Sequence, residues 1–169
     1  NEIKNISPTS VHAITIPGAV DAWCRLHERF GKLDFGSLLL PAIKCAREGH
    51  AVHERVAREW EIAFPRLHSK SSINSFSNAG YPPKAGETYR NFSLAKTLEN
   101  IALNGRSGFY DGEVAEKMFR HLKSLGGLHT LEDFSTAKGE FLNPISTKYK
   151  GHDVYQVPPN SQGIIALLM

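Results

Sequence analysis

The chain has 169 residues, of which 41% are hydrophobic and 22% charged, and its formal net charge at pH 7 is +3. This balance is typical of a globular chain with one core, and the interspersed acidic and basic residues do not form the basic stripe that would indicate a nucleic-acid partner. The apolar runs are far shorter than the roughly 20 residues of a membrane-spanning helix, so no membrane span is expected.

Apolar residues at steps of three and four predict a series of helices in the first third of the chain. The first covers residues 20–30, between a Pro-Gly start and a Gly stop. The second runs from residue 38 to the Gly at position 49, and its Pro41 is expected near the first turn, where a missing N–H is tolerated. The third is charged and amphipathic, covers residues 54–60 and is limited by Pro65.

The middle of the chain loses this pattern and then regains it. Residues 69–90 are rich in Ser, Asn, Gly and Pro, which predicts a surface excursion. A helical face returns at residues 94–101. Asn91 or Ser93 is placed to cap this helix, and Asn104-Gly105 is placed to stop it.

Two further helices and a hairpin are expected after residue 110. One helix covers residues 114–125, and a shorter helix carrying Phe134 begins at a variant capping box formed by Thr130 and Asp133. Two extended segments, residues 141–149 and 152–157, are separated by Lys150-Gly151 and predict a hairpin, in which Pro144 pushes the first strand towards an edge position.

The last predicted helix, residues 161–169, follows a Pro-Pro turn and is still apolar at Met169. An apolar helix without a polar face or C-cap indicates that further protein covers it, although it could also end within the core of this domain. The predicted fold class is α/β in the α+β sense, a predominantly helical chain with a C-terminal strand pair.

His50, His53 and Glu54 form the cluster that most resembles a metal site. A zinc-protease helix needs the order H-E-x-x-H or H-x-x-E-H, so that two rings and a general base converge on one side. The sequence here reads H-A-V-H-E, and a glycine next to His50 indicates a helix boundary. Surface histidines are therefore favoured over a metal hydrolase.

Candidate nucleophiles are equally weak. Ser161 lies at a strand-to-helix turn, where a nucleophile elbow would be, but it lacks the preceding Gly of that motif, so a structural role is favoured. Cys24 and Cys45 lie in apolar helical runs, which favours small buried hydrophobes over a disulfide, a metal pair or activated thiolates. No residue is assigned as catalytic, substrate-binding or metal-ligating, and no cofactor is expected.

Several stretches resemble, in the same order, the large-subunit segment of γ-glutamyltranspeptidases. The resemblance spans roughly residues 10–169, and the ordered set is far more specific than any one motif. The stretches are Ile16-Pro17-Gly18-Ala19-Val20, Pro41-Ala42-Ile43-Lys44-Cys45-Ala46-Arg47-Glu48-Gly49, Gly108-Phe109-Tyr110-Asp111-Gly112-Glu113, Gly126-Gly127-Leu128-His129-Thr130-Leu131-Glu132-Asp133-Phe134 and Tyr149-Lys150-Gly151 with Pro158-Pro159.

The resemblance implies an N-terminal-nucleophile hydrolase, made as one precursor that cleaves itself into large and small subunits around an αββα core. Residues 1–169 would then be a single partial domain, an internal piece of the large subunit. The family's nucleophile is the Thr that begins the small subunit, whose α-amino group can act as base, and it is expected beyond Met169. The Arg that pairs with the substrate carboxylate is expected upstream of the V-P-G-like segment, and residues 1–15 contain no Arg.

The implied reaction is cleavage of γ-glutamyl amides, such as glutathione and its conjugates, with transfer of the acyl group to water, amino acids or peptides. The implied partners are the rest of the large subunit and the small subunit, and the chain alone is expected to be inactive. Cephalosporin acylases and small-amide hydrolases of the same superfamily, or a non-catalytic helical scaffold, are the alternatives. A periplasmic or cell-surface location is implied, and Asn5-Ile6-Ser7 and Asn91-Phe92-Ser93 fit the glycosylation pattern.

Overall fold

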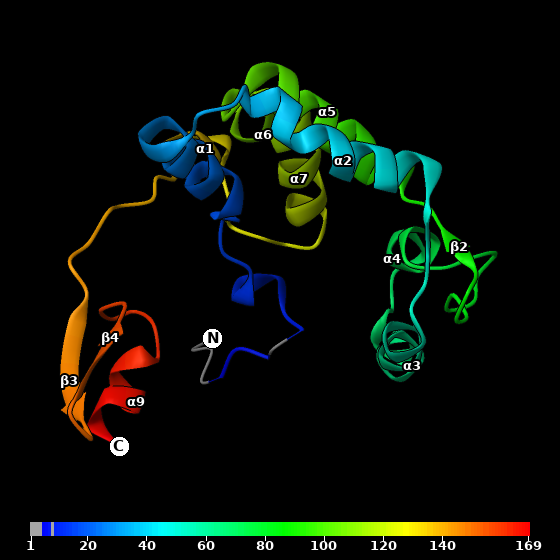
Figure 1. Cartoon of the computed structure of the whole chain (residues 1–169). Coiled ribbons are helices and arrows are strands. Elements are labelled where there is room, and N and C mark those ends of the chain that lie inside the picture. The colour runs from blue at the N-terminus through cyan, green and yellow to red at the C-terminus, as the bar shows by residue number, and fades with distance from the viewer. Residues whose placement is uncertain (1–4, 8) are drawn as a thin grey trace. The chain divides into compact units, whose positions relative to one another are not determined.

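The structure is a computed structural model that describes residues 5–7 and 9–169. Its contacts divide the chain into two compact units, the first ending at Ala137 and the second spanning Lys138–Met169. The first unit is mostly helical with one short strand pair, and the second holds a β-hairpin and a helix (Figure 1). This confirms the predicted fold class. The single partial domain stays a prediction, and each unit is described by itself.

After a short 3-10 turn, η1 (Val11–Ala13), the first two helices are α1 (Ala19–Phe30) and α2 (Phe35–Glu48). Both confirm the sequence prediction. Asp34 caps α2 by accepting a hydrogen bond from the Ser37 N–H at 2.8 Å. The expected position of Pro41 was wrong, because it lies in the second turn of α2 and not in the first. The helix persists there because Leu39 and Ile43, on either side of the proline, pack into the core against α5 (Phe92–Asn104).

The segment between α2 and α5 contains more regular structure than the sequence predicts. The helix α3 (Glu54–Ala63) is as expected, and η2 (Phe64–Arg66), α4 (Lys70–Ser75) and the antiparallel pair of β1 (His50–Ala51) with β2 (Thr88–Tyr89) are additional. The prediction of a surface excursion at residues 69–90 is therefore only partly confirmed. Tyr89 is buried because its ring packs on Trp60 at 4.7 Å and its hydroxyl donates to the Ser75 carbonyl at 2.5 Å.

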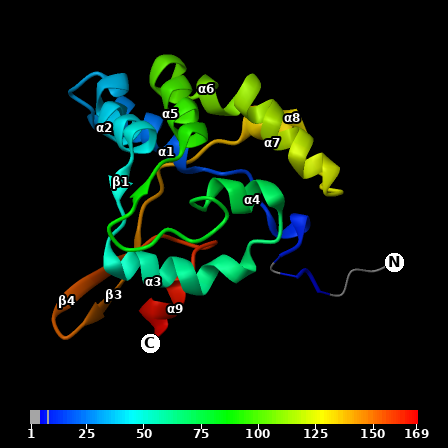
Figure 2. The same cartoon turned by 90° about the vertical axis from the view of Figure 1, so that its right-hand side faces the viewer.

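A run of helices completes the first unit. Figure 2 shows α5 leading through the short α6 (Ser107–Tyr110) into α7 (Glu113–Ser124), which α8 (Leu131–Thr136) follows. Asn91, not Ser93, caps α5, since its Oδ1 accepts from the Leu94 N–H at 2.9 Å. The predicted capping box is confirmed: Thr130 Oγ1 accepts from the Asp133 N–H, and the Asp133 carboxylate accepts from the Thr130 N–H. The sequence analysis missed α6.

Two clusters of buried side chains form the core of the first unit. One joins α1, α2, α5 and α6 through Val20, Ile43, Leu98, Ile101 and Tyr110. The other joins α7 and α8 through Ala115, Leu122 and Phe134, the last of which is 0% exposed. The helical periodicity read from the sequence identified members of both clusters, among them Ile43, Leu98 and Leu122. The predicted face of α1 was wrong beyond Val20, because Trp23, Leu26 and Phe30 are exposed.

The second unit is the hairpin of β3 (Ile145–Tyr149) and β4 (His152–Gln156), followed by α9 (Gly163–Leu168). Lys150 and Gly151 both have positive φ, 48° and 81°, as a two-residue type I′ turn requires. The hairpin is confirmed, although its first strand begins only after Pro144. No side chain of residues 138–169 is buried. In the described part of the chain, no helix is long and apolar enough to cross a membrane.

Candidate functional site

The histidine cluster does not converge in space. His50 belongs to β1, where its ring meets Tyr89 edge-on at 6.1 Å, whereas His53 caps α3 by accepting from the Arg55 N–H at 3.2 Å. Both histidines are exposed, which confirms their interpretation as surface residues. Among the described residues, no group of three or more His, Cys, Asp or Glu side chains is arranged to hold a metal ion.

The surroundings of the candidate nucleophiles do not activate them. Ser161 uses its hydroxyl within its own turn, donating to the Val157 carbonyl at 3.0 Å and accepting from the Gly163 N–H at 3.3 Å. Cys24 is half-buried beside the core of α1, and burial raises the pKa of its thiol, so it is not an activated thiolate. Cys45 is also free, but the prediction that it is buried was wrong, because it lies on the solvent-exposed side of α2.

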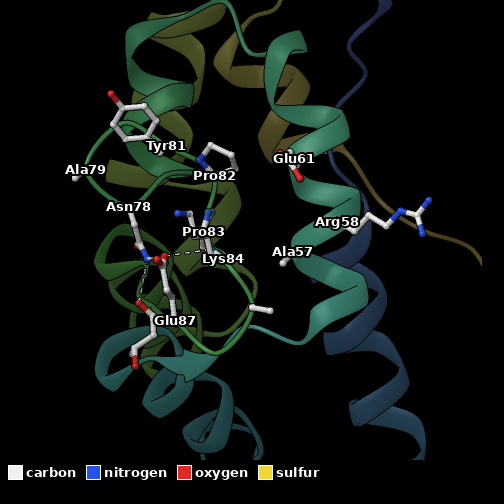
Figure 3. Close-up of a pocket in the computed structure, with 12 residues that line it drawn as sticks. Ala57, Arg58, Glu61, Asn78, Ala79, Tyr81, Pro82, Pro83, Lys84 and Glu87 are labelled. Atoms are coloured by element: carbon white, nitrogen blue, oxygen red, sulfur yellow. Dashed lines mark hydrogen bonds between the residues drawn. The ribbon is translucent and has the colours of Figure 1, made fainter.

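An open groove of about 1130 Å³ lies between α3 and the loop that follows α4 (Figure 3). Its walls combine small or rigid apolar side chains, such as Ala57 on the helix and Pro82 and Pro83 on the loop, with polar and charged ones. The Arg58 side chain points away from the loop, so its charge is not directed into the groove. The groove is therefore a concave surface whose side chains do not converge on one point as catalytic groups would.

The polar residues of this groove hold the loop in place. The Glu87 carboxylate accepts from the Lys84 N–H at 3.0 Å and from the Asn78 amide at 3.3 Å (Figure 3). The backbone bond from Lys84, followed by the bond from Asn78, lowers the pKa of Glu87. The residues that line the groove include no Ser, Cys or His.

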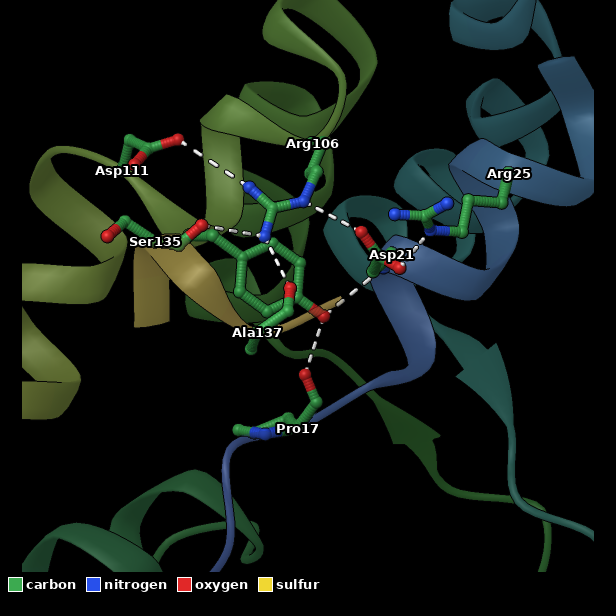
Figure 4. Close-up of polar contacts among 8 residues, drawn as sticks. Pro17, Asp21, Arg25, Arg106, Asp111, Ser135 and Ala137 are labelled. Carbon is green, nitrogen blue, oxygen red and sulfur yellow. Dashed lines mark hydrogen bonds and ion pairs between the residues drawn. The ribbon is translucent and has the colours of Figure 1, made fainter. Parts of the chain in front are cut away.

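The most developed polar cluster in the first unit is centred on Asp21 of α1, which is 2% exposed. Its Oδ2 accepts from Arg25 Nε at 2.7 Å, and its Oδ1 accepts from Arg106 Nε at 2.7 Å (Figure 4). A buried carboxylate is costly unless it is paired and hydrogen-bonded. The two arginines meet this requirement from different parts of the sequence.

Arg106, the residue immediately before α6, connects this carboxylate to the end of α8. Its Nη2 donates to the carbonyls of Ser135 and Ala137, at 3.1 and 2.5 Å. Its Nη1 lies 3.9 Å from the Asp111 carboxylate, and the guanidinium carbon lies 4.5 Å from the centre of the Tyr110 ring. The guanidinium therefore has hydrogen-bond partners at Nε and Nη2, an ion-pair partner beside Nη1 and an aromatic ring on one face.

Tyr110 completes the cluster from α6. Its hydroxyl donates to the Pro17 carbonyl at 2.5 Å and accepts from the Asp21 N–H at 3.2 Å (Figure 4). Burial raises the pKa of this phenol. The cluster connects the start of α1 to α6 and to the end of α8. Its role is therefore structural. The sequence analysis missed it, because no local spacing connects Asp21 with Arg106.

Similarity to known proteins identifies the family of this chain. The sequence model of the family described as gamma-glutamyltranspeptidase matches residues 1–169. The chain belongs to the γ-glutamyltranspeptidase family. This confirms the resemblance carried by the I-P-G-A-V entry and the motifs that follow it.

Other family members share both the sequence and the fold of this segment. The glutathione hydrolase-like YwrD proenzyme of Bacillus subtilis (strain 168) is 38% identical over 157 residues, which make up 92% of this chain and 30% of that protein. The structure of γ-glutamyltranspeptidase from Helicobacter pylori matches with a TM-score of 0.87 and 30% identity, covering 96% of this chain and 47% of that one.

A cephalosporin acylase from Bacillus halodurans matches with a TM-score of 0.89 and 34% identity, covering 95% of this chain and 31% of that one. The chain thus spans less than a third of the Bacillus subtilis relative and of this acylase. The prediction that this chain itself carries no catalytic or substrate-binding residue stays a prediction.

Proposed function

We propose that the protein to which this chain belongs is an N-terminal-nucleophile enzyme that cleaves γ-glutamyl amides, such as glutathione and its conjugates. It transfers the γ-glutamyl group to water, amino acids or peptides. The observation that carries this proposal is the family match over all of residues 1–169. The chain forms part of the large subunit and does not itself react with substrate.

The contacts of the candidate site residues support a structural role for this chain and a catalytic role for other parts of the protein. Ser161 is engaged in a turn, His53 in a helix cap and Cys24 in packing. The Asp21 cluster joins structural elements. We therefore place the nucleophilic threonine and the carboxylate-binding arginine in other parts of the protein. The Bacillus subtilis relative is named a proenzyme, which supports maturation by self-cleavage.

The proposed partners of this chain are the rest of the large subunit and the small subunit. The second unit supports this, because its large apolar side chains are exposed: Tyr155 is 60%, Ile165 54% and Leu168 81% accessible. An isolated two-stranded hairpin is at best marginally stable in water. Among the described residues β3 pairs only with β4, so the outer edge of each strand is available to further strands.

The test uses the full-length precursor and, separately, residues 1–169. We expect the precursor to cleave itself into two subunits and then to release nitroaniline from a γ-glutamyl nitroanilide. Residues 1–169 alone should release none. Turnover by residues 1–169 alone would contradict the non-catalytic role. Absence of both cleavage and turnover in the precursor would favour a scaffold, and stoichiometric zinc would favour a metal hydrolase.

A second candidate is acylase activity on cephalosporin-type amides, favoured by the likeness to the Bacillus halodurans acylase. The same precursor preparation distinguishes the two, because each substrate presents a different acyl group to one nucleophile. Faster release of the acyl group from a cephalosporin-type amide than from the γ-glutamyl anilide would support the acylase.

We also propose a periplasmic or cell-surface location for the intact protein, as the family resemblance implies. Fractionation of the native cells with an antibody against this chain tests the proposal. Recovery of the protein in the cytosolic fraction would contradict it.

A further inference from the structure

The two units meet in sequence at Ala137, where the first unit ends and the second begins at Lys138. Arg106 bonds the chain at this point. The carbonyls of Ser135 and Ala137 lie at the end of α8, where backbone acceptors lack partners within the helix. One guanidinium nitrogen, Nη2, donates to both carbonyls, so a single side chain adds two bonds to the backbone bond from the Ala137 N–H to the Asp133 carbonyl.

Arg106 is itself held against movement. Its Nε is bonded to Asp21, which is 2% exposed, and its guanidinium lies over the Tyr110 ring. A planar guanidinium with several fixed donors loses all of these contacts together when it rotates. The position of the bound carbonyls is therefore coupled to α1 and α6 and does not depend on α8 alone.

We propose that Arg106 is a positioning residue that anchors the start of residues 138–144, the segment leading from Ala137 to β3. Its bonds to the carbonyls of Ser135 and Ala137 fix where this segment leaves the first unit. The consequence for the enzyme rests on the proposed function: if the hairpin joins the sheet of the mature protein, loosening its anchor slows self-cleavage. The anchoring itself is independent of that function.

Arg25 provides a matched control for this proposal. It pairs with the same carboxylate through the same type of nitrogen at the same 2.7 Å, but from α1 and on the other oxygen. Both Arg25→Gln and Arg106→Gln therefore remove one ion pair from Asp21. Only the second change removes the bonds to Ser135 and Ala137.

The experiment measures amide hydrogen exchange across residues 134–146 of the full-length protein, with circular dichroism to establish that each variant is folded. Loss of two bonds from a charged donor loosens the end of α8. We therefore expect the Ala137 amide, whose N–H donates to the Asp133 carbonyl at 3.2 Å, to exchange about tenfold faster in Arg106→Gln. Arg25→Gln should change this amide by less than about twofold. Equal acceleration in both variants, or unchanged exchange in a folded Arg106→Gln, would overturn the proposal.

Arg106→Lys covers the case in which the Gln variant does not fold. Lysine keeps a cation beside Asp21 but cannot bridge two carbonyls while doing so, so we expect a folded protein with an intermediate exchange rate at the Ala137 amide. Global unfolding of both Arg106 variants would show a general structural role and overturn the proposal.

The rate of self-cleavage is the second readout, and we expect Arg106→Gln to slow it more than Arg25→Gln does. Failure of the unchanged protein to cleave itself would contradict the proposed function. The exchange measurement would still decide the role of Arg106.

Discussion

Asp21 and Arg106 lie 85 positions apart in the sequence, and Arg106 Nε donates to Asp21 Oδ1 at 2.7 Å. This contact brings a helix near the start of the chain against the residue that precedes α6. The carboxylate is buried and the guanidinium is about one quarter exposed, so the pair is poorly screened by solvent. The junction between α1, α6 and α8 therefore depends on a few specific side chains.

Replacing Asp21 with Asn is expected to destabilise the first unit by about 3 kcal/mol, because it leaves the cation of Arg106 without its buried counter-ion. Urea unfolding of the variant and of the unchanged protein measures the difference. Arg25→Gln is the control and should cost no more than about 1 kcal/mol, since Arg25 is partly exposed. Equal losses in the two variants would contradict the central position of Asp21.

Tyr110→Phe is expected to cost about 1–3 kcal/mol, because it removes a hydroxyl that bonds both the Pro17 carbonyl and the Asp21 N–H from a buried ring. The same unfolding measurement applies. Tyr81→Phe is the matched control, because Tyr81 is 74% exposed and its loss should change stability by less than about 0.5 kcal/mol. A neutral Tyr110→Phe would show that water replaces the hydroxyl.

Phe134→Ala is expected to destabilise the packing of α8 on α7 by about 3–5 kcal/mol, because the ring is completely buried against Ala115 and Leu122 and its removal leaves a cavity. Urea denaturation followed by tryptophan fluorescence and circular dichroism measures the loss. Phe92→Ala, at a 63% exposed position, should remain within about 0.5 kcal/mol of the unchanged protein. Similar effects at both positions would argue against the cluster as a core.

The Asp133 carboxylate should make the stability of α8 depend on pH. Bonds from the Thr130 N–H and hydroxyl lower its pKa from the ordinary 3.8, and the nearby His129 also lowers it. A carboxyl group whose pKa is lower in the folded than in the unfolded state stabilises the fold fully at pH values above its ordinary pKa. This stabilisation is lost as the pH falls through the lowered pKa of the folded state.

We therefore expect Asp133→Asn to be less stable than the unchanged protein at pH 7, and this difference to shrink below about pH 4. Urea midpoints measured across this range test the expectation. Glu132→Gln is the control, because it removes the neighbouring carboxylate and leaves the capping box intact. A difference between Asp133→Asn and the unchanged protein that stays constant down to pH 2 would contradict the assignment.

Local signals account for what the sequence predicted correctly. Helices α1, α5, α7 and α8 and the hairpin follow from apolar periodicity, caps and the Lys150-Gly151 turn, all of which involve residues close together in the chain. Even a detail such as the Thr130–Asp133 capping box is predictable, because both partners lie within one turn. The ordered motifs also carried the family assignment.

The errors have a common cause in long-range contacts. The pairing of β1 with β2 joins His50 to Tyr89 across the chain, and neither two-residue strand has a recognisable pattern of its own. Pro41 remains inside α2 because packing against α5 outweighs one missing backbone bond. Such effects cannot be read from a window of neighbouring residues.

The sequence by itself determined most of the helices, the hairpin and the family, because these depend on residue types at short, regular spacings. Only the tertiary structure decided that His50 and His53 separate, that Asp21 meets Arg106 and Tyr110, and that Arg106 holds the carbonyl of Ala137. The physical reason is that buried charges and unpaired carbonyls must find partners in space, wherever those partners lie in the chain.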